Sequence, residues 1–234
     1  MKLFKLSVLT LLFLFINSVS ASTIIDSFND TSPQSVYNLP NLGLSSLSNT
    51  TATTNALGGW RKLELSTNNG SDGASLNVTG GQLSLNAGSN TSATGTVTWD
   101  KNGAGLNADL LVSDTLGFTG SSCYECFVLD VFKIDQGNVD LTIQLFDGSN
   151  TTSYTSSGIG TGIQEILFSN FTGINLNSID SISLIIAGDQ ASDMTLNFQG
   201  YTGKQVSSVP LPATVWLFAT GLISFLGTHR KKLS

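Results

Sequence analysis

Histidine is almost absent from this chain of 234 residues, and the one histidine, His229, lies close to the C-terminus. The region before it therefore has no imidazole for a Ser-His-Asp or Cys-His catalytic arrangement, or for a histidine-ligated metal. This excludes most hydrolase mechanisms. Paired carboxylates can hydrolyse glycosidic bonds without histidine, but no spacing among the sixteen Asp and Glu residues singles out a pair.

Cysteine is nearly as scarce, with one Cys-Tyr-Glu-Cys motif formed by Cys123 and Cys126. A thioredoxin-type redox site needs this spacing at the start of a helix in an α/β setting, whereas a Gly-Ser-Ser turn precedes the motif and a β-type run follows it. Two thiols also cannot complete a zinc site that needs four ligands. We expect a local disulfide that fixes a turn, in an oxidising compartment.

Basic residues are few outside the two ends of the chain. Five of the ten basic residues belong to the terminal segments. The other five and all sixteen acidic residues lie between these segments, so the central part of the chain has a net charge of −11. Such a surface repels phosphate backbones and argues against a nucleic-acid partner. It suits an extracellular protein or one that recruits divalent cations.

The N-terminal residues 1–21 have the pattern of a secretory signal peptide. Lys2 and Lys5 form a positive region, Leu6 to Ile16 is apolar, and Val19-Ser20-Ala21 is a small-residue cleavage site. Cleavage after Ala21 by signal peptidase is expected. The alternative is a retained N-terminal anchor, although the apolar run is short for a membrane span.

The C-terminal residues 207–234 combine three features in order. The motif Val209-Pro210-Leu211-Pro212-Ala213 should interrupt regular structure, residues 213–228 are apolar and predicted to be helical, and the basic stop follows as Arg230, Lys231 and Lys232. The alternative is a buried core helix, but the apolar residues show no 3.6-residue period. We expect a transmembrane helix with its basic end in the cytoplasm.

These features resemble the PEP-CTERM family of bacterial sorting signals, in the variant that has Val-Pro-Leu-Pro-Ala in place of Pro-Glu-Pro. The resemblance covers about a tenth of the chain. It implies a partner, an exosortase-type membrane protease that cuts near the motif. It also implies transient anchoring in the inner membrane, then release to the cell surface or to an exopolysaccharide and biofilm matrix.

Alternating apolar and polar residues predict short antiparallel strands between the two signals. Val139, Leu141, Ile143 and Leu145 form the clearest apolar face, and turn pairs such as Gly80-Gly81 separate the strands. The other predicted strands are Ile24 to Phe28, Leu63 to Ser66, Ser75 to Val78, Gln82 to Leu85, Thr94 to Trp99, Phe127 to Ile134, Ile179 to Ala187 and Met194 to Phe198. Residues 31–56, rich in Ser, Thr and Asn, are predicted to be a mobile loop.

The predicted fold is an all-β antiparallel β-sandwich of the jelly-roll type over residues 22–206, flanked by the N-terminal signal helix and the C-terminal transmembrane helix. The segments 25–30, 57–61, 99–100 and 179–197 resemble exported jelly-roll domains of the galactose-binding-like type. That resemblance implies a binding module more readily than an enzyme, and implies carbohydrate or structural calcium as ligands.

Candidate ligand residues follow from side-chain chemistry. Carboxylate and amide oxygens suit calcium, and the candidates are Asp26, Asn29, Asp30 and Asp189. The alternative is that these are ordinary turn and strand-end residues. Sugar rings stack on exposed aromatic side chains, and the candidates are Trp60, Trp99, Tyr124 and Tyr154; Trp60 and Trp99 fit a core position equally well. Arg61 is expected to pair with a buried aspartate, for example Asp100.

The sequence thus predicts an exported surface or matrix protein that is structural or associated with exopolysaccharide. One alternative is a secreted carbohydrate-active enzyme with paired carboxylates in an aromatic cleft. A second is a structural surface protein without a ligand. No cofactor is expected apart from a candidate structural calcium.

Overall fold

The computed structural model describes residues 23–39, 46–68, 72–111 and 121–203. The predicted signal peptide, the sorting motif Val209 to Ala213 and the basic stop lie outside these residues. No helix in the described ranges is long and apolar enough to cross a membrane.

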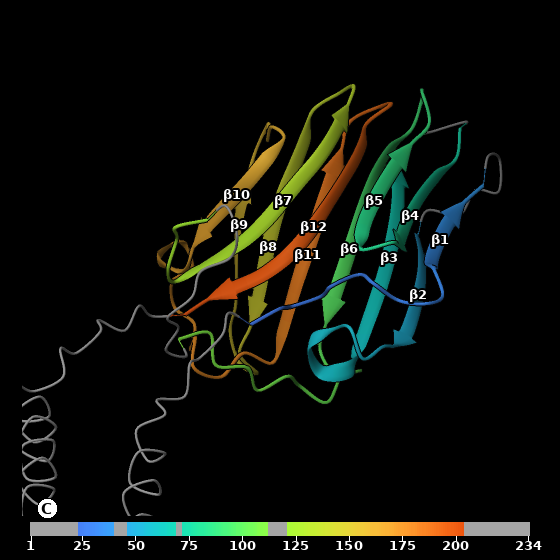
Figure 1. The fold of residues 1–234 in the computed structure, drawn as a ribbon. Helices are drawn as coiled ribbons and strands as arrows, with labels where there is room; N and C mark the ends of the chain where they lie inside the picture. The colour runs from blue at the N-terminus through green and yellow to red at the C-terminus, as the bar shows by residue number, and fades with distance from the viewer. Residues whose placement is uncertain (1–22, 40–45, 69–71, 112–120, 204–234) are drawn as a thin grey trace, which may run out of the picture.

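Two antiparallel six-stranded sheets face each other, which confirms the predicted β-sandwich (Figure 1). The first sheet has the order β1-β4-β5-β12-β7-β10, and the second has the order β2-β3-β6-β11-β8-β9. We call them the first and the second sheet. Their strands are β1 Gln34–Asn38, β2 Ser46–Ala52, β3 Trp60–Asn68, β4 Ala74–Thr79, β5 Gln82–Ala87, β6 Ser92–Trp99, β7 Cys126–Asp135, β8 Val139–Phe146, β9 Thr151–Ser156, β10 Gly162–Leu167, β11 Ser181–Gly188 and β12 Asp193–Thr202. Two short 3-10 turns, Leu57–Gly59 and Phe168–Asn170, are the helical elements of this region.

One apolar core fills the space between the sheets. Strand β8 shows how the sequence builds it, since Val139, Leu141, Ile143 and Leu145 are all buried while the residues between them face outward. At the centre, the ring of Phe127 packs edge-on against four other aromatic rings. The core of the described region is therefore built from apolar side chains at alternate positions of the strands.

The Gly80-Gly81 turn joins β4 to β5 as the sequence predicts. Both glycines have positive φ angles, 58° and 82°, and the flanking pair is Thr79 opposite Gln82. A two-residue hairpin loop with this twist needs residues that tolerate positive φ, which glycine supplies without strain.

The structure corrects the expectation of a strand over Ile24 to Phe28. Only isolated bridges occur there, from Thr23 to Tyr201 and from Asp26 to Ala56. Phe28 has a φ of 51°, and its N–H donates to Oδ1 of Asp26 at 2.8 Å. This local turn replaces an extended strand.

The range 31–56, expected to be a loop, contains β1 and β2. These edge strands lie at the same side of the two sheets, and side-chain amides join them. Gln34 Nε2 donates to the carbonyl of Asn49 at 3.0 Å, and Asn49 Nδ2 donates to the carbonyl of Ser35 at 3.2 Å. Polar side chains thus donate hydrogen bonds to backbone carbonyls of the two edge strands. A pattern of alternating apolar residues does not reveal this kind of strand.

Candidate functional site

Asp26 and Asp30, predicted as calcium ligands, bind Arg61 instead. The Arg61 side chain is fully buried, and its Nη1 donates to both carboxylate oxygens of Asp26 at 2.9 Å. Its Nη2 donates to Asp30, and its Nε donates to Oε1 of Gln34 at 2.8 Å. Trp99 Nε1 donates to Asp26 Oδ2 at 2.8 Å. The guanidinium therefore has carboxylate and amide acceptors around it, as a buried charge requires.

Burial raises the pKa of Asp26 above its usual value, although the Arg61 guanidinium and the N–H groups of Trp99 and Phe28 oppose the rise. Partial burial also opposes ionisation of Asp30. Hydrogen bonds from Thr53, Asn55 and Arg61 outweigh that effect and lower the pKa of Asp30.

The four predicted calcium ligands do not converge. Trp99, whose indole binds Asp26, is opposite Ile182 near the start of β11, whereas Asp189 follows the last residue of that strand. At about 3.4 Å per residue, the seven residues from Ile182 to Asp189 span about 24 Å along the sandwich, so Asp26 and Asp189 are far apart. Asn29 is exposed and contributes its backbone carbonyl to Asn55 Nδ2. Among the described residues, no group of three or more His, Cys, Asp or Glu could hold a metal ion.

The predicted sugar-contact rings do not form one site either. Trp99 is fully buried in the core. Tyr154 is partly buried, and its ring packs 6.4 Å from that of Phe171. Trp60, on β3, is half-buried and lies four strands away from Tyr154 in the second sheet, which is about 19 Å. Tyr124, also half-buried, precedes β7 in the first sheet.

Cys123 and Cys126 are joined by a disulfide. The loop that it closes is anchored to the end of β12, because Thr202 Oγ1 donates to the carbonyl of Cys123 at 2.9 Å. Both cysteines are buried beside Val128, in a small cluster apart from the main core. Their surroundings are those of a fixed turn rather than of an exposed thiol site.

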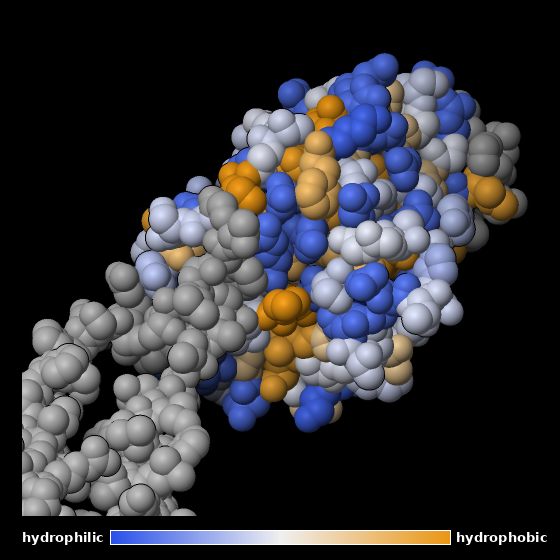
Figure 2. Space-filling model, viewed as in Figure 1, coloured by the Kyte–Doolittle hydropathy of each residue, from blue (hydrophilic) through white to orange (hydrophobic). Residues whose placement is uncertain are grey.

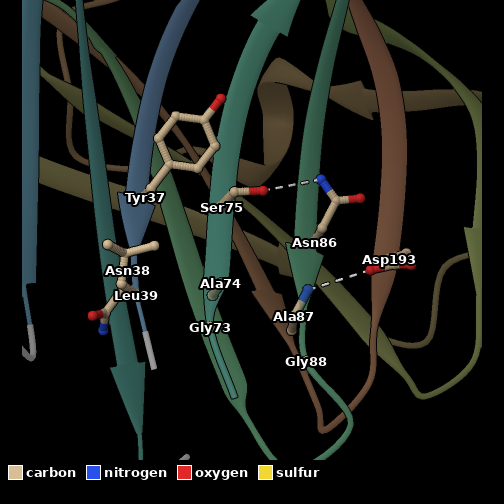
Figure 3. A pocket seen from close by; sticks show the side chains of 10 residues that line it. All are labelled: Tyr37, Asn38, Leu39, Gly73, Ala74, Ser75, Asn86, Ala87, Gly88 and Asp193. Carbon is tan, nitrogen blue, oxygen red and sulfur yellow. Dashed lines mark hydrogen bonds between the residues drawn. The ribbon is translucent and has the colours of Figure 1, made fainter. Parts of the chain in front are cut away.

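A hollow of about 450 Å³ opens on the outer face of the first sheet, and we call it the Tyr37 hollow (Figure 3). Tyr37 and Leu39 are its large apolar side chains, with 58% and 60% of their surface exposed. The lining residues are Tyr37, Asn38, Leu39, Gly73, Ala74, Ser75, Asn86, Ala87, Gly88 and Asp193.

Strand register sets the chemistry of the Tyr37 hollow. Tyr37 is opposite Ser75, Ser75 is opposite Asn86, and Asn86 is opposite Asp193, so the four form one row across four strands. Asn86 Nδ2 donates to Ser75 Oγ at 3.3 Å, and Asp193 Oδ1 accepts from the N–H of Ala87 at 3.3 Å (Figure 3). The row places an aromatic ring beside hydroxyl, amide and carboxylate groups that can donate and accept hydrogen bonds.

Sequence reasoning missed Tyr37 because β1 is five residues long and Val36 is its one apolar residue facing the core. That is too short a pattern to separate a strand from a loop. The surface seen in Figure 2 is mainly hydrophilic with separate apolar areas, so no continuous apolar patch marks a binding site on this side of the domain.

No protein-family model matches the sequence. A search of curated proteins also finds no match.

Three solved structures of carbohydrate-binding modules are similar to this chain. The Family 11 Carbohydrate-Binding Module of cellulosomal cellulase Lic26A-Cel5E of Clostridium thermocellum matches at 12% identity and a TM-score of 0.37, over 82% of this chain and 100% of that chain. The same family's module in complex with a beta-1,3-1,4-mixed-linked tetrasaccharide matches at 12% identity and a TM-score of 0.29, over 73% of this chain and 98% of that chain. TmCBM61 in complex with beta-1,4-galactotriose matches at 9% identity and a TM-score of 0.30, over 64% and 84% of the two chains. Matches at these identities and TM-scores do not indicate which ligand this chain binds.

Proposed function

We propose that this protein is an exported cell-surface or extracellular-matrix component whose β-sandwich binds polysaccharide through the Tyr37 hollow. The observation that supports this most directly is the row from Tyr37 to Asp193. An exposed ring offers a face on which a pyranose can stack, and the polar residues beside it can exchange hydrogen bonds with sugar hydroxyls. The hollow of about 450 Å³ lies within the usual size range of ligand sites.

Binding is a better account of the Tyr37 hollow than catalysis. Hydrolysis of a glycosidic bond by paired carboxylates needs two of them on either side of the bond. Asp193 is the one acidic residue among those that line this hollow, and its Oδ1 already accepts a backbone hydrogen bond. The proposed role is therefore adhesion to a glycan.

Affinity electrophoresis of the full chain tests this proposal. The gels would contain dextran, soluble starch, mixed-linkage β-glucan or galactan, with alginate and pectate as polyanionic counterparts. We expect retardation in at least one uncharged polysaccharide and at least a tenfold weaker affinity for Tyr37→Ala, equivalent to about 1.4 kcal/mol. Phe146→Ala, which removes an exposed ring from the second sheet, is the matched control.

Three other results would contradict the proposed binding. Binding that is identical in Tyr37→Ala and the wild type would remove the hollow from the proposal. Lack of binding to every polysaccharide would favour the alternative of a structural protein without a ligand. Release of reducing ends by the wild-type protein would favour a carbohydrate-active enzyme.

We also propose that the Val209 to Ala213 motif directs sorting by an exosortase-type protease. The support is the order of motif, apolar segment and basic stop in the sequence. Intact mass and terminal sequencing of protein from the host's surface and medium test it. We expect a start near Ser22 and an end near Val209, whereas a mature protein that retains residues 230–232 would contradict exosortase processing.

A further inference from the structure

A second hollow lies on the outer face of the second sheet, and we call it the Asp140 hollow. Its volume is about 670 Å³. The lining residues are Asn68, Ser92, Thr94, Asn138, Asp140, Ser157, Gly158, Ala187, Gly188 and Asp189. It is separate from the Tyr37 hollow, and of the candidate ligand residues named from the sequence only Asp189 lines it.

Small side chains form the floor of the Asp140 hollow. Ala187 is opposite Thr94 of β6 on one side and opposite Asp140 of β8 on the other. Two residues earlier on β11, the same face carries the larger Ile185. The fall in side-chain size from Ile185 to Ala187 leaves a depression between two polar walls.

The walls of the Asp140 hollow offer hydrogen-bonding groups that the fold leaves unused. The N–H of Gly158 donates to Asp140 Oδ1 at 2.9 Å, which orients the carboxylate and leaves Oδ2 without a partner among the described residues. Within the same described set, the side chains of Ser92, Thr94 and Asp189 have no hydrogen bond. In the Tyr37 hollow, in contrast, Ser75, Asn86 and Asp193 already make hydrogen bonds within the sheet.

The lining also restricts the class of ligand. It contains two carboxylates, three side-chain hydroxyls and two side-chain amides, and it has no lysine, arginine or aromatic ring. Carboxylates repel anions, so a uronic acid or a phosphorylated sugar is disfavoured. Without a ring to stack on, the ligand must be bound through its edges by hydrogen bonds from its own hydroxyl groups.

The two hollows are at the same end of the sandwich but on opposite faces. Asp189 lies in the turn before β12, and the N–H of Ala191 in that turn donates to the carbonyl of Gly88, which lines the Tyr37 hollow. The sheets between them are about 10 Å apart. One linear glycan segment cannot fill both hollows, because their openings face away from each other.

We propose that the Asp140 hollow binds a second segment of uncharged polysaccharide, so that a single domain cross-links two glycan chains. This inference rests on the proposed function, since the first segment occupies the Tyr37 hollow. A protein with two such sites stiffens a polysaccharide matrix without forming an oligomer, because each domain is itself a bridge.

The test uses Ala187→Leu, which fills the floor of the Asp140 hollow from an exposed position. Thr96→Leu is the matched control, because Thr96 faces the same side of β6 two residues from Thr94 and does not line the hollow. Asp140→Asn is a second variant that keeps the shape of the side chain. Thermal unfolding of each variant verifies that the fold is intact.

Two measurements use the same uncharged polysaccharides, in gels and coupled to beads. We expect Tyr37→Ala to retain weak retardation in the gel, and the addition of Ala187→Leu to weaken it at least tenfold further, while Thr96→Leu leaves it unchanged. The wild type should agglutinate the beads, and Tyr37→Ala or Ala187→Leu alone should abolish agglutination.

Three outcomes overturn this inference, and they are distinguishable. If Tyr37→Ala alone removes all binding and Ala187→Leu alters nothing, polysaccharide binding stands but the second site does not exist. If the wild type binds without agglutinating beads, the domain has one site. If the wild type binds no polysaccharide, the proposed function fails and the cross-linking role fails with it.

Discussion

Replacement of Asp26 by alanine should destabilise the fold strongly, although Asp26 lies in the short segment before β1. The change leaves the buried guanidinium of Arg61 without its bidentate partner and the indole N–H of Trp99 without an acceptor. Loss of one partner of a buried ion pair costs about 3–5 kcal/mol. For a domain of this size, each kcal/mol lowers Tm by about 2–4 °C, so we expect a decrease of about 6–20 °C.

Urea denaturation of Asp26→Ala measures the loss directly, with an unchanged m-value as evidence that the folded state is intact. Asp100→Ala is the control. Asp100 adjoins Trp99 in the sequence, but its hydrogen bonds in the described fold are those that its backbone carbonyl accepts from the N–H groups of Gly103 and Gly105. Its replacement should change stability by less than about 0.5 kcal/mol. If Asp26→Ala costs no more than Asp100→Ala, the Arg61 network does not stabilise the fold.

Three further predictions concern stability. Gly95→Ala places a methyl group 2.7 Å from a leucine side chain in the core and should cost about 1–3 kcal/mol by urea denaturation, whereas Gly160→Ala, which has open space around it, should cost little. The Cys123–Cys126 disulfide closes a very short loop, so its reduction should lower stability by no more than about 2 kcal/mol, and a decrease in Tm of more than about 8 °C would contradict the entropic estimate. Backbone N–H donors lower the pKa of Asp147 to about 2, so its stabilising contribution is present above about pH 4 and is lost as the pH falls toward 2. Asp147→Asn should flatten Tm against pH in that window, and an unaltered slope would refute the assignment.

Strand alternation was enough to predict most of the sandwich. Val139 to Leu145 and Thr94 to Trp99 lie within β8 and β6, because both have a buried apolar residue at every second position. Strand β9, with the sequence Thr-Thr-Ser-Tyr-Thr-Ser, was missed because it has no apolar alternation. Strand β10 was missed because its apolar residues Ile163, Ile166 and Leu167 break the two-residue period.

Side-chain partners were harder to predict than strands. The sequence indicated that Arg61 pairs with an aspartate, but its partners are Asp26 and Asp30 rather than Asp100. Asp100 was only one example of such an aspartate, and local sequence does not show that the fold brings the segment before β1 across the start of β3. The Tyr37 row arises from the pairing of β1, β4, β5 and β12, and strand order of this kind is not encoded in local periodicity.

The bridge between Thr23 and Tyr201 places the first described residues of the chain beside the end of β12, at one pole of the domain. Strand β12 runs from that pole to Asp193 in the Tyr37 hollow, over ten residues and about 30 Å. A chain held at the membrane through the segment after β12 would therefore present both hollows outward, toward the medium. Export, tethering and release would all act on one pole, while the opposite pole stays available to the matrix throughout.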